Sequence, residues 1–197
     1  MTETTTGARP GTPEGAETRL PAPGIFVFDP GHSYVGFVAR HLMVAKVRGQ
    51  FTDLTGTLTV AEDTALCSVE ATIHTASITT HNDQRDSHLR STDFLDTDRY
   101  PTMTFHSTAI VGSATSGLTV LGELSITECT RQVRVDVELN GVVTDPWGQQ
   151  RIALTATTQI DREDFGITFN APMDGGGYLI GKTVKIEIEI EAVRQTS

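Results

Sequence analysis

The sequence predicts an all-β domain in which about eight antiparallel strands form a closed barrel or a sandwich. From about residue 25 onwards, most segments alternate apolar and polar residues with period two. Their connections are mostly short and carry turn-forming residues, and one stretch alone, residues 82–90, has a helical composition. Because all-β chains of about 197 residues commonly form one unit, we expect a single domain.

The N-terminal segment, residues 1–24, is rich in Thr, Gly, Pro and Glu and poor in apolar residues. This composition predicts a disordered tail, so the folded domain is expected to span residues 25–197. The tail lacks the order of basic, apolar and small residues that marks a signal peptide. We therefore expect a cytoplasmic location for the chain as numbered.

The first predicted strand is Ile25–Phe28, which ends at the turn Asp29-Pro30-Gly31. A strand pair is expected within His32–Val47. The later strands are expected at Leu54–Val60, Val69–Thr75, Met103–Ser107, Ala109–Gly112, Leu118–Thr127, Arg131–Asn140, Arg151–Ile160 and Thr183–Val193.

An eight-stranded barrel is just wide enough to be filled by side chains or to hold one small ligand. Several small residues are predicted to point inward and leave room for a cavity: Ala39, Gly56, Ala71, Gly122, Ala153 and Ala156. In the last strand, Val184, Ile186, Ile188 and Ile190 are expected to face the interior, since charged residues alternate with them.

The helix predicted at about residues 82–90 interrupts the strand pattern and has a cap at Thr80 or Asn82. Its spacing places His81, Arg85 and His88 on one face, with Asp86 off that face and free to accept backbone hydrogen bonds. The alternative is a solvated helix that only closes one end of the barrel. One further turn is expected at 162–165.

The formal net charge of −10 argues against a general nucleic-acid or anionic-membrane surface, and no apolar run is long enough to span a bilayer. From Pro30 to Thr52, however, there is no acidic residue, and the charged residues are Arg40, Lys46 and Arg48. This zone suits an anionic or polar head group, or it pairs with acidic residues downstream. The two cysteines lack metal-site spacing and are expected to be buried or half-buried thiols.

A series of motifs between about residues 25 and 193 occurs in the order and spacing of one family. They are Phe26-Val27-Phe28-Asp29, His32-Ser33 with Phe37, Arg40-His41-Leu42-Met43-Val44, Val47-Arg48-Gly49-Gln50-Phe51, Ser77-Ile78-Thr79-Thr80, Arg85-Asp86-Ser87-His88-Leu89, Asp93-Phe94-Leu95-Asp96, Tyr100-Pro101-Thr102-Met103-Thr104-Phe105, Gly122-Glu123-Leu124-Ser125-Ile126 and Arg162-Glu163-Asp164-Phe165-Gly166-Ile167. On these motifs the chain resembles the YceI family of bacterial polyisoprenoid-binding, lipocalin-like proteins.

The resemblance implies an extended eight-stranded antiparallel lipocalin-like barrel with the short helix at one end. It also implies an apolar interior that takes up the tail of a polyprenyl phosphate or a prenylated quinone, with no cofactor required. The chain departs from the family pattern at Phe26, where Trp is frequent, and at Glu128-Cys129, where a glycine-containing turn is usual.

We therefore expect the protein to bind, sequester or transport an amphiphilic isoprenoid lipid. Its partners would then be this lipid, with no nucleic acid and no stable membrane insertion, and a homodimer is left open. The residues expected to contact the ligand are Phe37, Arg40, His41, His81, Arg85, His88, Phe94 and Phe105.

Two other functions are kept as alternatives, a metal-assisted hydrolase or other enzyme and a ligand-free structural or stress protein. The enzyme would use His81, His88 and His106. However, His81 and His88 are seven residues apart, too far for the His pair on adjacent turns of a zinc-binding helix. Since no other catalytic motif is found, catalysis is not expected.

Overall fold

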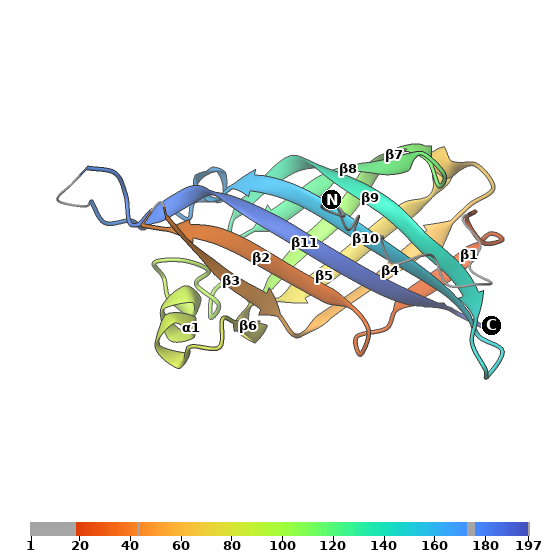
Figure 1. Ribbon diagram of the computed structural model, residues 1–197, viewed down its shortest axis with the longest axis horizontal. Coiled ribbons are helices and arrows are strands. Elements are labelled where there is room, and N and C mark those ends of the chain that lie inside the picture. Colours follow the sequence, from red (N-terminus) through yellow and green to blue (C-terminus); the bar gives the residue numbers. More distant parts are fainter. Residues whose placement is uncertain (1–18, 43, 173–175, 197) are drawn as a thin grey trace, which may run out of the picture.

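The computed structural model describes residues 19–42, 44–172 and 176–196, and it forms a closed antiparallel barrel with one α-helix (Figure 1). The helix is α1 (Asp83–Arg90), and short 3-10 turns lie at Thr64–Leu66, Thr75–Ser77 and Arg162–Phe165. The strands are β1 (Gly24–Phe28), β2 (Tyr34–His41), β3 (Ala45–Phe51), β4 (Leu54–Val60), β5 (Ser68–His74), β6 (Ile78–Thr79), β7 (Thr102–Ser113), β8 (Gly117–Ile126), β9 (Cys129–Thr144), β10 (Gln150–Asp161) and β11 (Ile180–Arg194).

Strand β11 closes the barrel because both of its edges are paired. One edge pairs with β10 along its length, and the other pairs with β2 through residues 180–189 and with β1 through residues 192–194. Strands β1 and β2 thus lie end to end and together occupy one strand position in the barrel wall. The pair β3 and β4 occupies a second position in the same way, and the pair β5 and β6 occupies a third. With β7 to β11, this gives the predicted eight-stranded barrel, which is confirmed.

Some details differ from the sequence-based expectation. The two segments Met103–Ser107 and Ala109–Gly112 form the single strand β7, with a β-bulge between Ser107 and Ala109. A bulge adds one residue to a strand, so it shifts the alternation and imitates a strand boundary in the sequence. The 3-10 turn at Arg162–Phe165 agrees with the turn predicted there.

Three of the small residues that were expected to leave room in the barrel do not do so. Gly56 and Gly122 are covered by the rings of Phe28 and Phe105, which occupy the space that a Cβ atom would take. A glycine without a side chain lets an aromatic ring from the neighbouring strand lie flat against the backbone. Ala153 faces outward, opposite Glu191, between two residues that line the interior.

The predicted disordered tail lies largely outside the described residues, and its last residues contact the barrel. Leu20 packs against the apolar core near the end of the barrel where β1 begins, and Pro21 is buried. Arg194 donates hydrogen bonds from its guanidinium to the carbonyl oxygens of Ala22 and Pro23. The described residues just before β1 are therefore held by the barrel, Leu20 through the apolar core and Ala22 and Pro23 through the end of β11.

Helix α1 is anchored by Asp86, whose side chain is only 4% exposed. Its carboxylate accepts hydrogen bonds from the amide and hydroxyl of Thr80, at 2.8 and 2.5 Å, and from the hydroxyl of Thr79 at 3.1 Å. The helix therefore folds back onto the segment that precedes it. This agrees with the expectation that Asp86 holds local structure by accepting hydrogen bonds.

The helix begins at Asp83, two residues after His81, so His81 cannot share a helical face with Arg85 and His88. Asn82 is the N-cap, and its side chain accepts a hydrogen bond from the amide of Arg85 at 2.9 Å. His81 precedes the cap, has a positive φ of 58° and is exposed. Arg85 and His88 remain on one helix face, whereas the expectation that His81 shares it is wrong.

We predict that Asp86→Ala lowers the free energy of unfolding by about 2–3 kcal/mol, because it leaves buried donors of Thr79 and Thr80 without an acceptor. Asp83→Ala, at an exposed carboxylate in the first turn of the same helix, is the matched control and should change stability by about 0.5 kcal/mol or less. Thermal unfolding followed by circular dichroism measures both variants.

The destabilisation by Asp86→Ala should also depend on pH. Burial by itself raises the pKa of Asp86, but the hydrogen bonds from Thr80 and Thr79 outweigh it and hold the pKa below its usual value. The stabilisation is therefore complete above about pH 4 and is lost as the pH falls through the folded-state pKa. A difference between the two variants that stays constant down to strongly acid pH would contradict this assignment.

Candidate functional site

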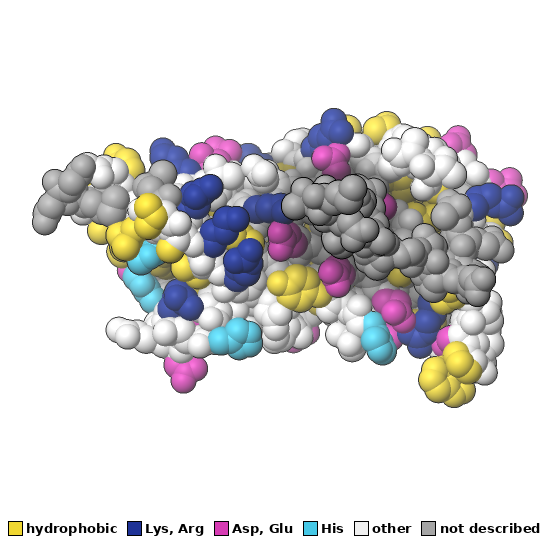
Figure 2. Space-filling view, viewed as in Figure 1, with side chains coloured by type: hydrophobic (Ala, Val, Ile, Leu, Met, Phe, Trp, Pro, Cys, Tyr) yellow, Lys and Arg dark blue, Asp and Glu magenta, His cyan; other side chains and the backbone are white. Residues whose placement is uncertain are grey.

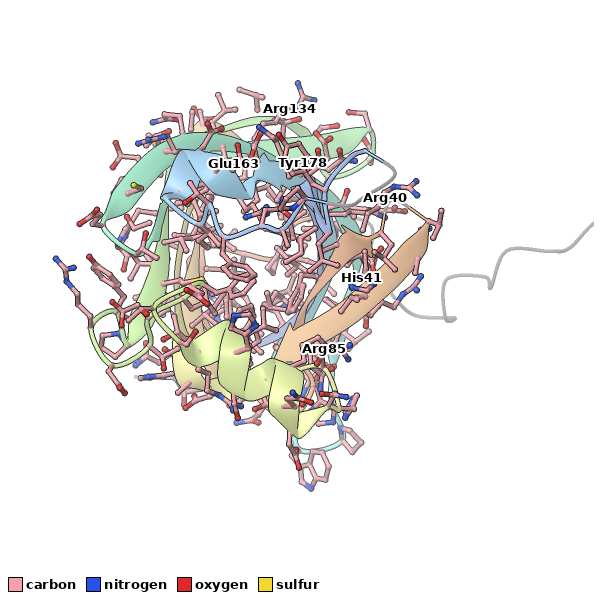
Figure 3. All side chains as sticks on the ribbon, turned by 90° about the vertical axis from the view of Figure 1, so that its left-hand side faces the viewer. Arg40, His41, Arg85, Arg134, Glu163 and Tyr178 are labelled. Carbon is pink, nitrogen blue, oxygen red and sulfur yellow. The ribbon has the colours of Figure 1, made fainter. Side chains whose placement is uncertain are left out.

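The barrel encloses a cavity of about 480 Å³ that extends along most of its length. At one end its lining includes Leu20, Val60 and Thr64, and at the other it reaches α1 and Phe169. Figure 3 looks into the barrel from the α1 end, with the helix crossing one side of the opening. In the middle the wall is apolar and includes Ile110, Val120, Val135, Ala156 and Ile188.

The alternation predicted for the last strand positions its side chains as expected. Val184, Ile186, Ile188 and Ile190 of β11 all line the cavity, and the charged residues between them do not. Of the small residues named from the sequence, Ala39, Ala71 and Ala156 also line it. A volume of this size lies within the range of about 300–1,000 Å³ that is typical of small-molecule sites.

The arginine and histidine side chains of the cavity lining gather at the α1 end, which we call the mouth, whereas the hydroxyl groups of Thr59, Thr64 and Ser68 lie toward the other end. The arginines and histidines are Arg40 and His41 from the end of β2 and Arg85 from α1 (Figure 3), with His88 from α1 and Arg162 from the 3-10 turn after β10. Seven of the eight residues predicted to contact a ligand line the cavity: Phe37, Arg40, His41, Arg85, His88, Phe94 and Phe105. His81 does not.

His88 is held in an aromatic cluster at the mouth. Its Nε2 lies 2.8 Å from Oδ2 of Asp93, and its ring meets Phe94 and Phe169 edge to face at 4.9 Å in each case. Phe94 and Phe169 are 5.3 Å apart, so the three rings contact one another. Sequence reasoning missed Phe169, since it lies outside any regular strand pattern.

Arg85 is both anchored and open to the cavity. Its Nε donates to the hydroxyl of Thr80 at 2.7 Å, and its Nη2 donates to the carbonyl of Thr80 at 3.1 Å. A guanidinium has five N–H donors, so these two hydrogen bonds leave three of them. The side chain is exposed at the mouth, where the remaining donors are available to a polar group.

Arg162 is a buried cation that sequence reasoning did not select. Its side chain is 4% exposed and donates to the carbonyl oxygens of Ile167, at 2.5 Å, and of Gly181, at 3.1 Å. Burial lowers the pKa of this guanidinium from its ordinary value. By these bonds it ties the 3-10 turn to the start of β11 and supports one side of the mouth.

The alternative metal site of His81, His88 and His106 does not assemble. His106 faces outward from β7, beside Glu70 at 4.0 Å, while His81 is exposed before α1 and His88 contacts Asp93. Among the described residues, these three histidines do not form a group with metal-ligand geometry.

One group of described residues does have suitable spacing for a metal, namely Asp29, His32 and Glu191 at the end of the barrel away from α1. Arg151 already occupies it. Its Nη1 donates to Asp29 at 2.9 Å and to Glu191 at 2.5 Å, and its Nε donates to Asp145 at 2.9 Å. The guanidinium thus supplies the positive charge that a metal ion would supply.

The described part of the chain has no helix with the length and apolar character needed to cross a membrane. The helix α1 has eight residues and carries charge along most of its length.

Comparison with known proteins gives a consistent assignment. The model of the YceI-like domain matches residues 26–192. A UPF0312 protein of Staphylococcus aureus strain bovine RF122 / ET3-1 is 38% identical over 168 residues, which cover 84% of this chain and 95% of the relative.

Solved structures share the fold. The YCEI protein of Campylobacter jejuni is 26% identical, with a TM-score of 0.66 and coverage of 80% of this chain and 90% of its own. Burkholderia cenocepacia BcnA has a TM-score of 0.71 at 21% identity, and the match covers 83% of this chain and 98% of BcnA. A polyisoprenoid-binding domain from Saccharophagus degradans has a TM-score of 0.62 at 14% identity, and the match covers 88% of this chain and 99% of that domain. The last two show the fold alone, whereas the domain match and the bacterial relative show that this chain belongs to the YceI-like family.

Proposed function

We propose that this protein binds an amphiphilic isoprenoid lipid, either a polyprenyl phosphate or a prenylated quinone, and sequesters or transports it. The observation that carries the proposal is the cavity of about 480 Å³, which is mostly apolar along the barrel and has arginine and histidine side chains at its mouth. The tail would lie in the barrel and the head at the mouth. The Saccharophagus degradans domain, named as polyisoprenoid-binding, supports the choice of ligand class.

In such a site the buried tail supplies most of the affinity, and the head group supplies the selectivity. Burying one CH₂ group contributes about 0.8 kcal/mol, so a five-carbon isoprene unit contributes about 4 kcal/mol before ordering costs. A few units already approach the practical ceiling of about 18–21 kcal/mol for non-covalent binding. The cavity should therefore hold long tails tightly and discriminate among their lengths poorly, which leaves head-group selectivity to the mouth.

Binding is favoured over catalysis by the way the polar groups at the mouth are engaged. Asp93 contacts His88, Thr80 accepts from Arg85, and Arg162 donates to backbone carbonyls. These contacts orient cations and aromatic rings around an opening, which suits the recognition of a head group. A ligand-free structural role remains the rival, and native mass spectrometry of freshly purified protein distinguishes it by the presence or absence of a co-purified lipid.

We predict that Ala156→Phe, which fills the middle of the cavity, weakens lipid binding by about tenfold or more, because an overpacked site excludes the tail. Ala153→Phe is the matched control, since it adds the same ring to the outward face of the same strand and should leave binding unchanged. Displacement of a fluorescent prenyl probe measures both. Equal affinities for the two variants would place the ligand outside the barrel.

We predict that a polyprenyl phosphate or a prenylated quinone binds more tightly than a fatty acid with a similar number of carbons. The curved wall of branched side chains on β9 and β11, such as Val135 and Ile188, should pack better against a methyl-branched tail. A competition assay with palmitate as the straight-chain competitor tests this, and equal competition by the two lipid classes would remove the isoprenoid part of the proposal.

We predict that Arg85→Ala weakens binding of an anionic-headed lipid by about ten- to a hundredfold, since a charge-assisted hydrogen bond contributes about 1.5–3 kcal/mol. The loss should be smaller for a neutral quinone with the same tail. Arg134→Ala removes an arginine from the outer wall and is the matched control (Figure 3). It should change neither the affinity for the anionic-headed lipid nor the affinity for the neutral quinone. Reduced thermal stability with unchanged affinity per folded molecule would assign Arg85 a structural role only.

A further inference from the structure

The β2–β3 hairpin at the mouth carries an exposed apolar tip. Leu42 is 41% exposed and Val44 is 83% exposed, and neither packs against the barrel core. The hairpin adjoins the opening of the cavity, because Arg40 and His41 at the end of β2 line it. Beside the hairpin, the amide of Leu42 donates to the carbonyl of Leu179 at 2.8 Å, which continues the pairing of β2 with β11. Tyr178, the residue before Leu179, is 56% exposed.

The backbone of this tip is strained as well as exposed. Leu42 has a φ of 51°, in the left-handed region that disfavours a bulky side chain and that glycine or asparagine usually occupies. A large apolar residue thus stands where both solvent and backbone favour a small or polar one. Strained backbone of this kind clusters at ligand clamps and switch regions, so it motivates a search for function here.

The charges of the hairpin show a third unfavourable feature. Arg40 and Lys46 are direct cross-strand partners, and like charges placed opposite each other destabilise a sheet. Together with Arg48, they form no ion pair within the described residues. Figure 2 shows Lys and Arg side chains gathered beside hydrophobic ones toward the same end of the molecule.

The opposite end of the barrel has exposed apolar residues too, but its charges differ. Leu66 is 71% exposed and follows the carboxylates Glu62 and Asp63. Trp147 is 81% exposed, and the nearby Asp145 and Arg151 neutralise each other in an ion pair, so no unpaired cation of that pair is offered to a lipid phosphate. An apolar tip flanked by cations matches an anionic lipid surface, whereas one flanked by carboxylates is repelled by it. Charges that lie farther from the membrane surface than the Debye length of about 8 Å are largely screened. The net charge of −10 of the whole chain therefore does not decide whether this end contacts an anionic membrane.

We propose that the β2–β3 hairpin docks the mouth of the barrel onto an anionic lipid bilayer. Leu42, Val44 and Tyr178 enter the interface between head groups and acyl chains, while Arg40, Lys46 and Arg48 meet the lipid phosphates. In this orientation the cavity opens directly toward the membrane, and a lipid tail can enter it without crossing water. This proposal rests on the proposed function in one respect, namely that the barrel takes up a lipid.

The experiment is flotation of the full chain with phosphatidylcholine vesicles that contain or lack phosphatidylglycerol. Binding is expected to the anionic vesicles and to weaken as salt is added. Val44→Asp, at an almost fully exposed position, should reduce binding about tenfold or more, and so should Lys46→Glu combined with Arg48→Glu. Leu66→Asp at the opposite end is the matched control and should bind as the unaltered protein does.

The single tryptophan of the chain gives an independent readout of orientation. Trp147 lies at the end away from the mouth, so its emission should not shift when anionic vesicles are added. In a Trp147→Phe background, Val44→Trp should show a blue shift with the same vesicles. A shift of Trp147 itself, equal loss of binding in Leu66→Asp, or no preference for anionic vesicles would overturn the proposal.

Failure of docking can be told apart from failure of lipid uptake. Val44→Asp should still take up a prenyl probe delivered in detergent, because its side chain does not line the cavity. Its transfer of the probe out of anionic vesicles should be slower than that of the unaltered protein. Unchanged transfer by Val44→Asp overturns docking alone, whereas absence of uptake from detergent by the unaltered protein overturns the proposed function alone.

Discussion

The pairing of β11 on both edges is the constraint on which the rest of the molecule depends. It joins β10 to β1 and β2, so the sheet has no open edge along this seam and the barrel is closed. Closure satisfies the backbone and leaves only side chains to face inward. A slip of one residue in this register would turn the row from Val184 to Ile190 outward and put charged side chains into the cavity.

The mouth exists because the wall is incomplete at one end. Strand β6 pairs with β3 through only two residues, and α1 follows where a longer strand would have extended the sheet. The helix is fixed by Asp86 and by Arg90, which donates to the carbonyls of Ala76 and Ile78 at 2.8 and 2.6 Å. This replacement of strand by helix brings the side chains of Arg85 and His88 to one end of a mostly apolar cavity.

The two ends of the barrel are built differently. Away from the mouth, Arg151 joins Asp29, Asp145 and Glu191, and its guanidinium holds the pKa of Asp145 below its usual range. This network ties the turn after β1, the β9–β10 hairpin and β11 together. At the mouth, by contrast, the cations of the β2–β3 hairpin have no carboxylate in ion-pair contact among the described residues. One end therefore holds its charges in a hydrogen-bonded network, whereas Lys46 and Arg48 at the other act on Glu187 only from a distance, where they help to lower its pKa.

The sequence by itself determined the alternating strands and most of the side chains that line the interior, because period-two alternation depends only on the local geometry of a strand. The alternation allowed a barrel or a sandwich, and the resemblance to the YceI family favoured the closed barrel. It also placed Arg85 and His88 on one helix face, because they are three residues apart in the chain, whereas Arg40 belongs to a distant motif that the fold brings to the same end of the cavity. Tertiary structure alone decided that Gly56 and Gly122 are filled by rings, that Ala153 faces outward, that His81 stands outside the helix, and that Arg162 and Phe169 reach the mouth. Each of these depends on cross-strand register, a bulge or a cap, and such features join residues whose separation in the sequence carries no periodic signal.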